Sequence, residues 1–442
     1  MKEVAQRVFR ETLEALDVSA VLDRKLARHG SQIRAGDSII DLRQFQKIVA
    51  IAFGKASFPM ADAVTRILAP DFRIEGILVT STNPLRPLAG WQVFVGGHPI
   101  PNEASFTAGR AILDRLSQCD RRTLVLFLIS GGGSSLVDLP LDPNVMLEDF
   151  QTLHKALVTC GASIDEINTI RKHLSATKGG RLATAARDSM KLTLAISDVP
   201  PGQESALASG PTLPDPTTVH DAERIAARYK LLDQLPVPLR ASFQNHTLRE
   251  TAKGDDPAFA NSRFELLLGV HELTHAAHHA CEAEGFLCVC DNSTDNWPIE
   301  KAADYLLGLL ERHAETEKRA GHGRPVAVIA DGELSSPVSG DGIGGRNSSF
   351  VLACVPKIAG RQITVFSAGT DGIDGNSSAA GAVADGETFT RARAAGLDPA
   401  EFYRRSDACS FFSRLGDAVC TGPTGNNLRD LRILLTHAVP RP

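Results

Sequence analysis

The chain lacks the features that mark nucleic-acid-binding and membrane proteins. It has no apolar run long enough to cross a membrane, no basic segment, and an aromatic content of only 5%. Nucleic-acid binding needs clustered positive charge and rings that stack on bases, whereas the net charge here is -5. We therefore expect neither a nucleic-acid partner nor a membrane partner.

Cysteine is sparse and forms no recognisable pattern. The eight cysteines are scattered over 442 residues, and their spacing fits no zinc ribbon. Residues 1–26 mix apolar and charged side chains and predict an amphipathic helix rather than a signal peptide. We expect free thiols in a cytoplasmic protein.

The apolar pattern predicts an α/β protein of two domains, because 442 residues exceed a single core. Short β-rich segments alternate with helical ones, which is typical of a mostly parallel sheet with helices on both faces. We place the domain border within residues 244–262 and divide the chain into 1–250 and 251–442. The expected strands are residues 47–53, 74–80, 92–95, 123–129, 192–196, 264–270, 286–290, 326–330, 363–366, 418–421 and 431–435, and the main expected helices are 57–68, 102–117, 147–160, 271–284 and 300–313.

The segment SGGGSSLVDLP, residues 130–140, follows an expected strand and is the most informative of the chain. Gly131, Gly132 and Gly133 leave their backbone N–H groups uncovered, and the hydroxyls of Ser134 and Ser135 add donors. An anion can lie against such a main chain, and open α/β sheets bind ligands at the carboxyl ends of strands. We interpret the segment as a binding site for phosphate or carboxylate; a plain glycine-rich turn is the alternative.

Two cations stand beside further glycine-rich loops. Lys55 follows a strand and a glycine and opens a helix, where free N–H groups favour anions. It is not part of a P-loop, because Val49 replaces the upstream glycine, and a surface lysine is the alternative. Arg346 follows the stretch SGDGIGG, and its guanidinium can bind phosphate or carboxylate through two hydrogen bonds. That stretch also has dinucleotide-fingerprint spacing, which we discount because no strand directly precedes it.

Carboxylates occur at other strand ends. Asp198 lies in AISDVPPG, and Asp371 and Asp374 lie in GTDGID. Such groups can hold Mg²⁺ or accept a proton from an alcohol, and the alternative for each is an Asx turn or a helix cap. The string HELTH at residues 271–275 has the zincin spacing, but its histidines share a polar stripe opposite an apolar one, so we expect a solvated helix face.

The motifs together resemble those of one family. The matching strings are GKAS, GGHPIP, SGGGSSL, IDEINTIRKHLSATKGGRLA, SDV, ASGPTLPDPTT, GGRN, GTDGIDG and TGPTGNNLRDL. On them the chain resembles, from about residue 5 to 435, the glycerate 2-kinases with a C-terminal MOFRL domain, some of which are labelled hydroxypyruvate reductase. The resemblance implies a larger, Rossmann-like N-terminal domain, a smaller MOFRL domain, and an active site in the cleft between them.

The resemblance also implies an activity. Members of the family transfer a phosphoryl group from ATP, with Mg²⁺, to the 2-hydroxyl of D-glycerate, so we expect 2-phosphoglycerate as the product or a related small hydroxy acid as the acceptor. The family's lysine, arginine and aspartate fall on Lys55, Arg346 and Asp198, and Asp198 is the expected Mg²⁺ ligand. Its basic segment falls on residues 171–178, where Arg171 and Lys178 add positive charge for polyphosphate. A small-molecule acceptor and a nucleotide are the implied partners, and a homodimer is left open.

Two departures from the family pattern leave alternatives open. The chain reads VPPGQ at residues 199–203 where members carry Gly-Asp, and Ser348 and Ser349 stand where members carry Gln-Glu. Both changes remove acidic groups near expected site residues. The alternatives are an NAD(P)H-dependent hydroxypyruvate reductase and a non-catalytic relative that binds sugar acids.

Overall fold

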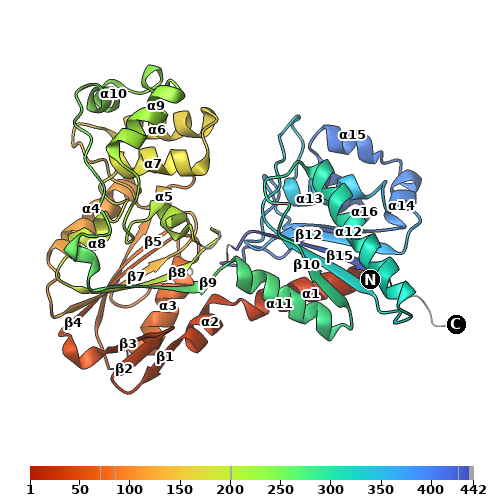
Figure 1. Ribbon diagram of the computed structural model, residues 1–442, viewed down its shortest axis with the longest axis horizontal. Helices are drawn as coiled ribbons and strands as arrows, with labels where there is room; N and C mark the ends of the chain where they lie inside the picture. Colours follow the sequence, from red (N-terminus) through yellow and green to blue (C-terminus); the bar gives the residue numbers. More distant parts are fainter. Residues whose placement is uncertain (70, 85, 200–201, 427, 438–442) are drawn as a thin grey trace. The chain divides into compact units, whose positions relative to one another are not determined.

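The computed structural model describes residues 1–69, 71–84, 86–199, 202–426 and 428–437, and these form two compact units (Figure 1). Unit 1 consists of Met1–Asp17 and Leu268–Pro442, and unit 2 consists of Val18–Leu267. Residues 251–267, which we assigned to the second domain, therefore cluster with unit 2, because strand β9 (Ser262–Leu268) joins its sheet. Helix α1 (Lys2–Ala15) belongs to unit 1, where it packs on α11 (Val270–Ala283).

Unit 2 is built on a six-stranded sheet with the order β6-β5-β4-β7-β8-β9. If β4 is counted as the first strand, this is the 3-2-1-4-5-6 order of Rossmann folds. All strand pairs from β6 to β8 are parallel, as expected. The strands are β4 (Lys47–Phe53), β5 (Ile74–Thr80), β6 (Trp91–Val95), β7 (Thr123–Ile129), β8 (Met190–Ile196) and β9.

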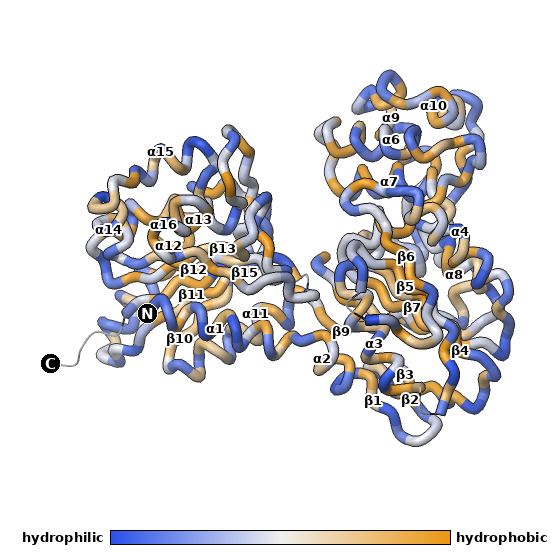
Figure 2. Tube along the Cα trace, turned by 180° about the vertical axis from the view of Figure 1, so that it is seen from behind, coloured by the Kyte–Doolittle hydropathy of each residue, from blue (hydrophilic) through white to orange (hydrophobic). Residues whose placement is uncertain are grey.

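The central strands are recognisable in the sequence because helices cover the sheet. Strand β7 is buried along its whole length, so it is a continuous apolar run, and Figure 2 shows hydrophobic colour along it. Helix α4 (Glu103–Ser117) is capped by Asn102, whose side chain accepts the N–H of Ser105 in a capping box. Helices α5 (Gly133–Leu136) and α8 (Arg181–Ala185) share an apolar core with α4, and α3 (Ser57–Leu68) packs on β4, β5 and β7.

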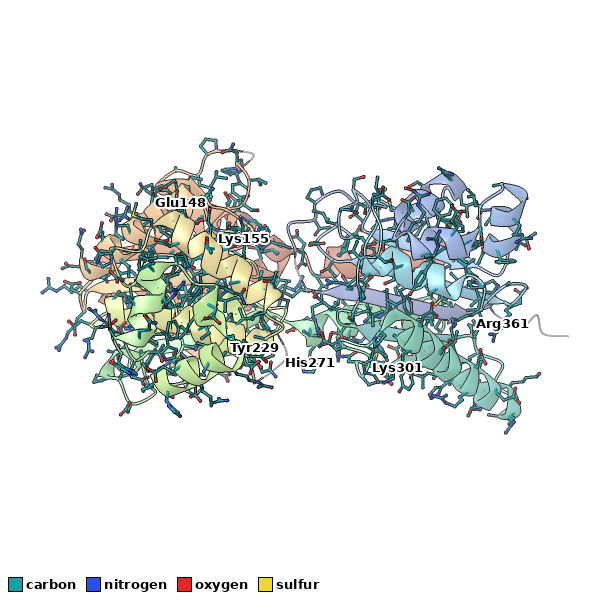
Figure 3. All side chains as sticks on the ribbon, turned by 90° about the horizontal axis from the view of Figure 1, so that it is seen from above. Glu148, Lys155, Tyr229, His271, Lys301 and Arg361 are labelled. Carbon is teal, nitrogen blue, oxygen red and sulfur yellow. The ribbon has the colours of Figure 1, made fainter. Side chains whose placement is uncertain are left out.

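A group of four helices lies at one end of unit 2 (Figure 1). It comprises α6 (Leu147–Thr159), α7 (Ile164–Leu174), α9 (Val219–Arg228) and α10 (Val237–Gln244), which share an apolar core around Phe150 and Ile170. Figure 3 shows Glu148 and Lys155 on α6, and Tyr229 directly after α9. The Tyr229 hydroxyl donates to Glu166 on α7 at 2.7 Å and so links two of these helices.

The opposite end of unit 2 holds elements that the sequence did not predict. A three-stranded antiparallel sheet follows α2 (Val18–Lys25) and consists of β1 (Leu26–His29), β2 (Gln32–Ala35) and β3 (Ser38–Asp41). The single helix expected over residues 1–26 is wrong, because α1 ends at Ala15 and α2 belongs to a different unit. Strands of four residues are too short for a clear period of two.

The sheet of unit 1 is mixed and has the order β10-β11-β15-β12-β13-β14. The parallel arrangement expected from the alternating pattern holds here for β10 and β11 and is otherwise wrong. The last strand, β15, runs antiparallel between β11 and β12, and β13 and β14 add two further antiparallel pairs beyond β12. The strands are β10 (Leu287–Cys290), β11 (Val326–Asp331), β12 (Ile363–Gly369), β13 (Gly381–Asp385), β14 (Ala418–Val419) and β15 (Asp430–Thr436).

Helices complete unit 1. Besides α1 and α11 they are α12 (Ile299–Arg319), α13 (Arg346–Cys354), α14 (Thr388–Ala394), α15 (Pro399–Arg404) and α16 (Ala408–Leu415). None of the helices among the described residues combines the length and the apolar character that a membrane crossing requires. The eight cysteines are free thiols, which confirms that expectation.

Candidate active site

Three of the expected site segments meet at one edge of the unit 2 sheet. Lys55 follows β4, the glycine-rich loop follows β7, and Asp198 follows β8, and these three strands are parallel neighbours. Between β4 and β7 the strand order reverses direction, which is where open α/β sheets bind their ligands. The fold therefore brings together residues 55, 131–135 and 198, which are separated by more than 140 positions in the sequence.

The turn after β4 is locked to the turn after β7. The Lys55 N–H donates to the Gly131 carbonyl at 2.9 Å, and the Ala56 N–H donates to Ser130 Oγ at 2.9 Å. Gly54 has φ +121°, and a Cβ on it would lie 2.2 Å from Ser130 Oγ, so only glycine fits this approach. The half-buried Lys55 is thereby held beside the glycine-rich loop.

His98 is a candidate site residue that sequence reasoning missed. A Cβ on Gly132, whose φ is +82°, would lie 3.1 Å from the His98 ring and 3.4 Å from Lys55 Cγ. Partial burial lowers the pKa of His98, and the neighbouring Lys55 ammonium lowers it further, so the imidazole is neutral at pH 7. The signal was the string GGHP directly after an expected strand.

The other side of the glycine-rich loop faces a segment with unusual backbone. Ala208 and Ser209 have φ of +48° and +61°, a left-handed conformation that non-glycine residues adopt at a cost of about 1–3 kcal/mol. Ser134 Oγ lies 3.1 Å from Ser209 Oγ, which in turn donates to Asn168 on α7 at 2.9 Å. Such backbone strain concentrates at functional sites. We therefore include the segment ASGP, residues 208–211, in the candidate active site.

Lys178 forms a buried ion pair with Asp138, a residue not singled out from the sequence. Lys178 Nζ lies 2.7 Å from Asp138 Oδ2, and the two side chains are 1% and 0% exposed. Burial raises the pKa of Asp138, but the Lys178 ammonium and His154 outweigh it and bring the pKa to about 2. The Lys178 ammonium is therefore committed to the interior just behind the glycine-rich loop, rather than open to a ligand.

The remaining basic residues of this segment are also largely buried. Burial lowers the pKa of Arg171, an effect that Asp138 partly offsets, and Arg171 Nε has no hydrogen-bond partner among the described residues. Lys172 donates to Asp215 at 3.1 Å. Arg171 thus keeps donor capacity for a ligand, whereas Lys172 is paired within the fold.

Asp198 is half-buried at the end of β8. The sequence departs from the family pattern just after Asp198, at residues 199–203. Within this stretch, Pro200 and Pro201 lie outside the described residues, and the Gly202 N–H donates to Glu204 at 2.8 Å. No group of three His, Cys, Asp or Glu side chains placed to hold a metal ion occurs in the part of the chain that is described. A Mg²⁺ site there would depend on one carboxylate and on oxygens of the substrate, which is how Mg²⁺ is commonly bound.

In unit 1, Arg346 is held by two carboxylates. It is the first residue of α13, its Nε donates to Asp430, and its Nη2 lies 2.8 Å from Glu333. Burial lowers the pKa of Arg346, and Asp430 and Glu333 more than compensate, so the pKa is raised. The Arg346 side chain is about one third exposed, and the two carboxylates fix the orientation of its guanidinium.

Asp374 serves as a cap of α13, the alternative that sequence reasoning left open. Its carboxylate accepts the N–H groups of Asn347 and Ser348 at 2.9 Å each, and the Ser348 hydroxyl at 2.6 Å. The side chain is buried and occupies the anion position at the helix N-terminus. Ser348, one of the departures from the family pattern, is thereby part of the cap. Asp371 Oδ1 accepts the N–H of Ile373 at 3.0 Å, as in an Asx turn.

A second charged cluster lies at the end of β11. The buried Arg432 donates to the carbonyls of Asp331 and Gly332, and Arg429 is paired with Asp295. Burial raises the pKa of Asp331 to about 6, and its Oδ2 has no hydrogen-bond partner among the described residues. This cluster supports the chain around Glu333, which is one of the two acids that hold Arg346.

The HELTH string lies on α11, where His271 and His275 are exposed and Leu273 is buried. The expectation of a solvated helix face is confirmed.

Comparison with known proteins supplies the family. The model of a domain of unknown function, DUF4147, matches residues 4–244, and the MOFRL family model matches residues 326–430. D-glycerate 2-kinase of Thermotoga maritima is 33% identical over 402 residues, which cover 90% of this chain and 93% of that protein. A relative in Agrobacterium vitis named as a hydroxypyruvate reductase is 35% identical over 392 residues, which cover 88% of this chain and 87% of the relative.

Solved structures agree with the two-unit architecture. The crystal structure of a glycerate kinase from Thermotoga maritima matches with a TM-score of 0.84 at 31% identity and covers 99% of both chains. The crystal structure of a Pyrococcus horikoshii protein matches with a TM-score of 0.81 at 30% identity and covers 99% of this chain and 98% of that one. Fold and site thus define an α/β enzyme of the kinase class. Within that class, the chain belongs to the glycerate 2-kinase family that combines a DUF4147 domain with a MOFRL domain, which confirms the resemblance.

Proposed function

We propose that this enzyme transfers the γ-phosphoryl group of ATP to the 2-hydroxyl of D-glycerate and releases 2-phosphoglycerate. The observation that carries the proposal is the sheet edge between β4 and β7, where the Lys55 N–H donates to the Gly131 carbonyl at 2.9 Å and so holds Lys55 beside the glycine-rich loop. The name of the relative in Thermotoga maritima supports the same acceptor.

Phosphoryl transfer requires alignment and positive charge on the moving group more than covalent chemistry. Lys55 would bind the transferred phosphoryl group, and the N–H groups of Gly131 to Gly133, with the Ser134 and Ser135 hydroxyls, would hold phosphate oxygens or the acceptor carboxylate. Arg346 would add a guanidinium whose orientation Asp430 and Glu333 maintain. Asp371 and Arg171 are further proposed ligand contacts.

Asp198 is proposed to accept the proton of the acceptor hydroxyl or to bind Mg²⁺. Bound Mg²⁺ would neutralise charge on the phosphates, and Asp198 is the carboxylate at this edge that would hold it. The neutral imidazole of His98, next to Lys55, can accept a hydrogen bond from the acceptor.

An ADP-release assay with D-glycerate, ATP and Mg²⁺ tests the proposal, and phosphorus NMR distinguishes 2-phosphoglycerate from the 3-isomer. We expect Lys55→Ala and Arg346→Gln each to lower kcat by about 10²-fold or more, because each removes charge that acts on the transition state. The matched controls are Lys155→Ala, on the exposed face of α6, and Arg361→Gln, whose partner is Glu311. Both controls should retain full activity.

Two outcomes would contradict the proposal. Unchanged turnover in Lys55→Ala and Arg346→Gln would remove these residues from the mechanism. Consumption of NADH with hydroxypyruvate, without ADP release on D-glycerate, would assign the chain to the reductase activity for which the Agrobacterium vitis relative is named.

A further inference from the structure

A cavity lies within the helical group of unit 2. Its volume is about 250 Å³, and it is bordered by the loop at residues 141–145, the end of α7, helix α10 and residues 247–249. Its apolar walls come from Leu141, Val145, Leu174, Leu239 and Leu248. The volume is just below the range of about 300–1,000 Å³ for common small-molecule sites, so the occupant is smaller than a nucleotide.

His173 borders this cavity, but its ring is closed to the contents of the cavity. It lines the cavity, its side chain is 0% exposed, and its Nδ1 donates to the Thr169 carbonyl at 2.8 Å. Burial lowers the pKa of His173, so the ring is neutral and Nε2 carries a lone pair. Nε2 lies 3.8 Å from Glu250 Oε2 and has no accessible surface, so the ring forms part of the wall and does not contact a ligand in the cavity.

Charges of both signs stand at the rim. Arg249 lines the cavity and is exposed, so its guanidinium can reach a ligand carboxylate. Asp142 also lines the cavity; its Oδ1 accepts the N–H of Asn144 at 2.9 Å, so Oδ2 is left to accept from an ammonium. A ligand that satisfies both groups carries one positive and one negative charge.

We propose that this cavity binds a zwitterionic α-amino acid with an aliphatic side chain of about the size of leucine. The side chain would fill the space between the leucines and Val145, and the carboxylate would pair with Arg249. The ammonium would pair with Asp142. This site is separate from the sheet edge of the proposed kinase site and does not depend on the proposed function.

Three probes that share one hydrocarbon skeleton test the proposal on the full chain. L-leucine carries both charges, 4-methylpentanoate lacks the ammonium, and 3-methylbutylamine lacks the carboxylate. Titrations followed by saturation-transfer NMR should give L-leucine a Kd in the millimolar range or below. Each singly charged analogue should bind at least tenfold more weakly. No saturable leucine signal, or equal binding of all three probes, would overturn the proposal.

Variants then assign each charge to its residue. Arg249→Gln should weaken L-leucine binding at least tenfold without affecting 3-methylbutylamine. Asp142→Asn, which keeps an oxygen for Asn144, should weaken L-leucine without affecting 4-methylpentanoate. Arg187→Gln, whose partner is Asp256 on the surface of unit 2, is the matched control and should bind like the unmodified protein. Loss of leucine binding in the control, or its retention in Arg249→Gln, would contradict the assignment.

Discussion

Replacing Asp138 by asparagine should destabilise unit 2 by about 3–5 kcal/mol, because it leaves the buried Lys178 ammonium without its counter-charge. The two side chains are 0% and 1% exposed and 2.7 Å apart, so water cannot take the place of the carboxylate. Asparagine keeps the shape of the side chain and an oxygen that can still accept from Ser175, which donates to Asp138 at 2.6 Å. The loss therefore reports the charge rather than the packing.

The double variant Asp138→Asn with Lys178→Met separates the two contributions. Removing both charges avoids the unpaired ammonium, so we expect it to be clearly more stable than Asp138→Asn alone. The chain has two tryptophans, Trp91 in unit 2 and Trp297 in unit 1. Urea unfolding followed by Trp91 fluorescence in a Trp297→Phe background therefore reports on unit 2. The reasoning is refuted if Asp138→Asn costs less than about 1 kcal/mol, or if the double variant is as unstable as that single variant.

The pH dependence of the same pair gives an independent check. The pKa of Asp138 lies at about 2 in the folded state, below its ordinary value of 3.8. The carboxylate therefore contributes stability at pH values above about 4, and this contribution is lost as the pH falls through about 2. A shift of nearly two units corresponds to about 2 kcal/mol. Asp138→Asn should lack this acid-dependent loss.

Three further substitutions test the site from other sides. Asp374→Ala should destabilise unit 1 by about 2–3 kcal/mol, because four hydrogen-bond donors at the start of α13 lose their acceptor. Urea unfolding followed by the fluorescence of Trp297 measures this loss. A loss of less than about 0.5 kcal/mol would contradict the role of Asp374 as a helix cap. Asp331→Asn should stabilise unit 1 by about 1–3 kcal/mol at pH 8 and should have no such effect at pH 4. The folded-state pKa of Asp331 is about 6, so ionisation of this carboxyl group destabilises the folded state as the pH rises through 4 to 6. Equal effects of the substitution at both pH values would refute this. Gly132→Ala should lower kcat strongly in the ADP-release assay and destabilise the protein by about 1–2 kcal/mol. The reasons are that Gly132 has φ +82° and that the new methyl group would lie against the His98 ring. Full activity of this variant would show that the glycine-rich loop is not at the reacting centre.

The sequence predicted those strands whose own residues show that they are buried. Strands β4, β5 and β7 match the expected ranges, because strands buried on both faces are continuous apolar runs. The small sheet β1–β3 and strand β13 were missed, because segments of four or five residues carry too little periodicity. The mixed sheet of unit 1 depends on β15, a strand whose neighbours lie more than 60 residues earlier in the chain.

The candidate site likewise contains some features that the sequence predicted and others that it did not. Glycine-rich strings and the cations near them can be found in a sequence, because glycine marks backbone that must approach another group. The partners of Asp138, Asp374 and Arg346 could not be found, since ion pairs and caps join residues that are 40, 26 and 84 positions apart. Lys178 and Asp374 therefore face structural partners, although their residue types suited a ligand equally well.

By itself, the sequence determined the family, the α/β class and the loops that carry Lys55 and residues 131–135. Local backbone demands and the burial of β4 and β7 are visible in consecutive residues. Only the tertiary structure decided which charges are available. Burial and the nearest opposite charge fix whether a lysine or aspartate meets a ligand or the protein interior, and both depend on segments that the chain brings together when it folds.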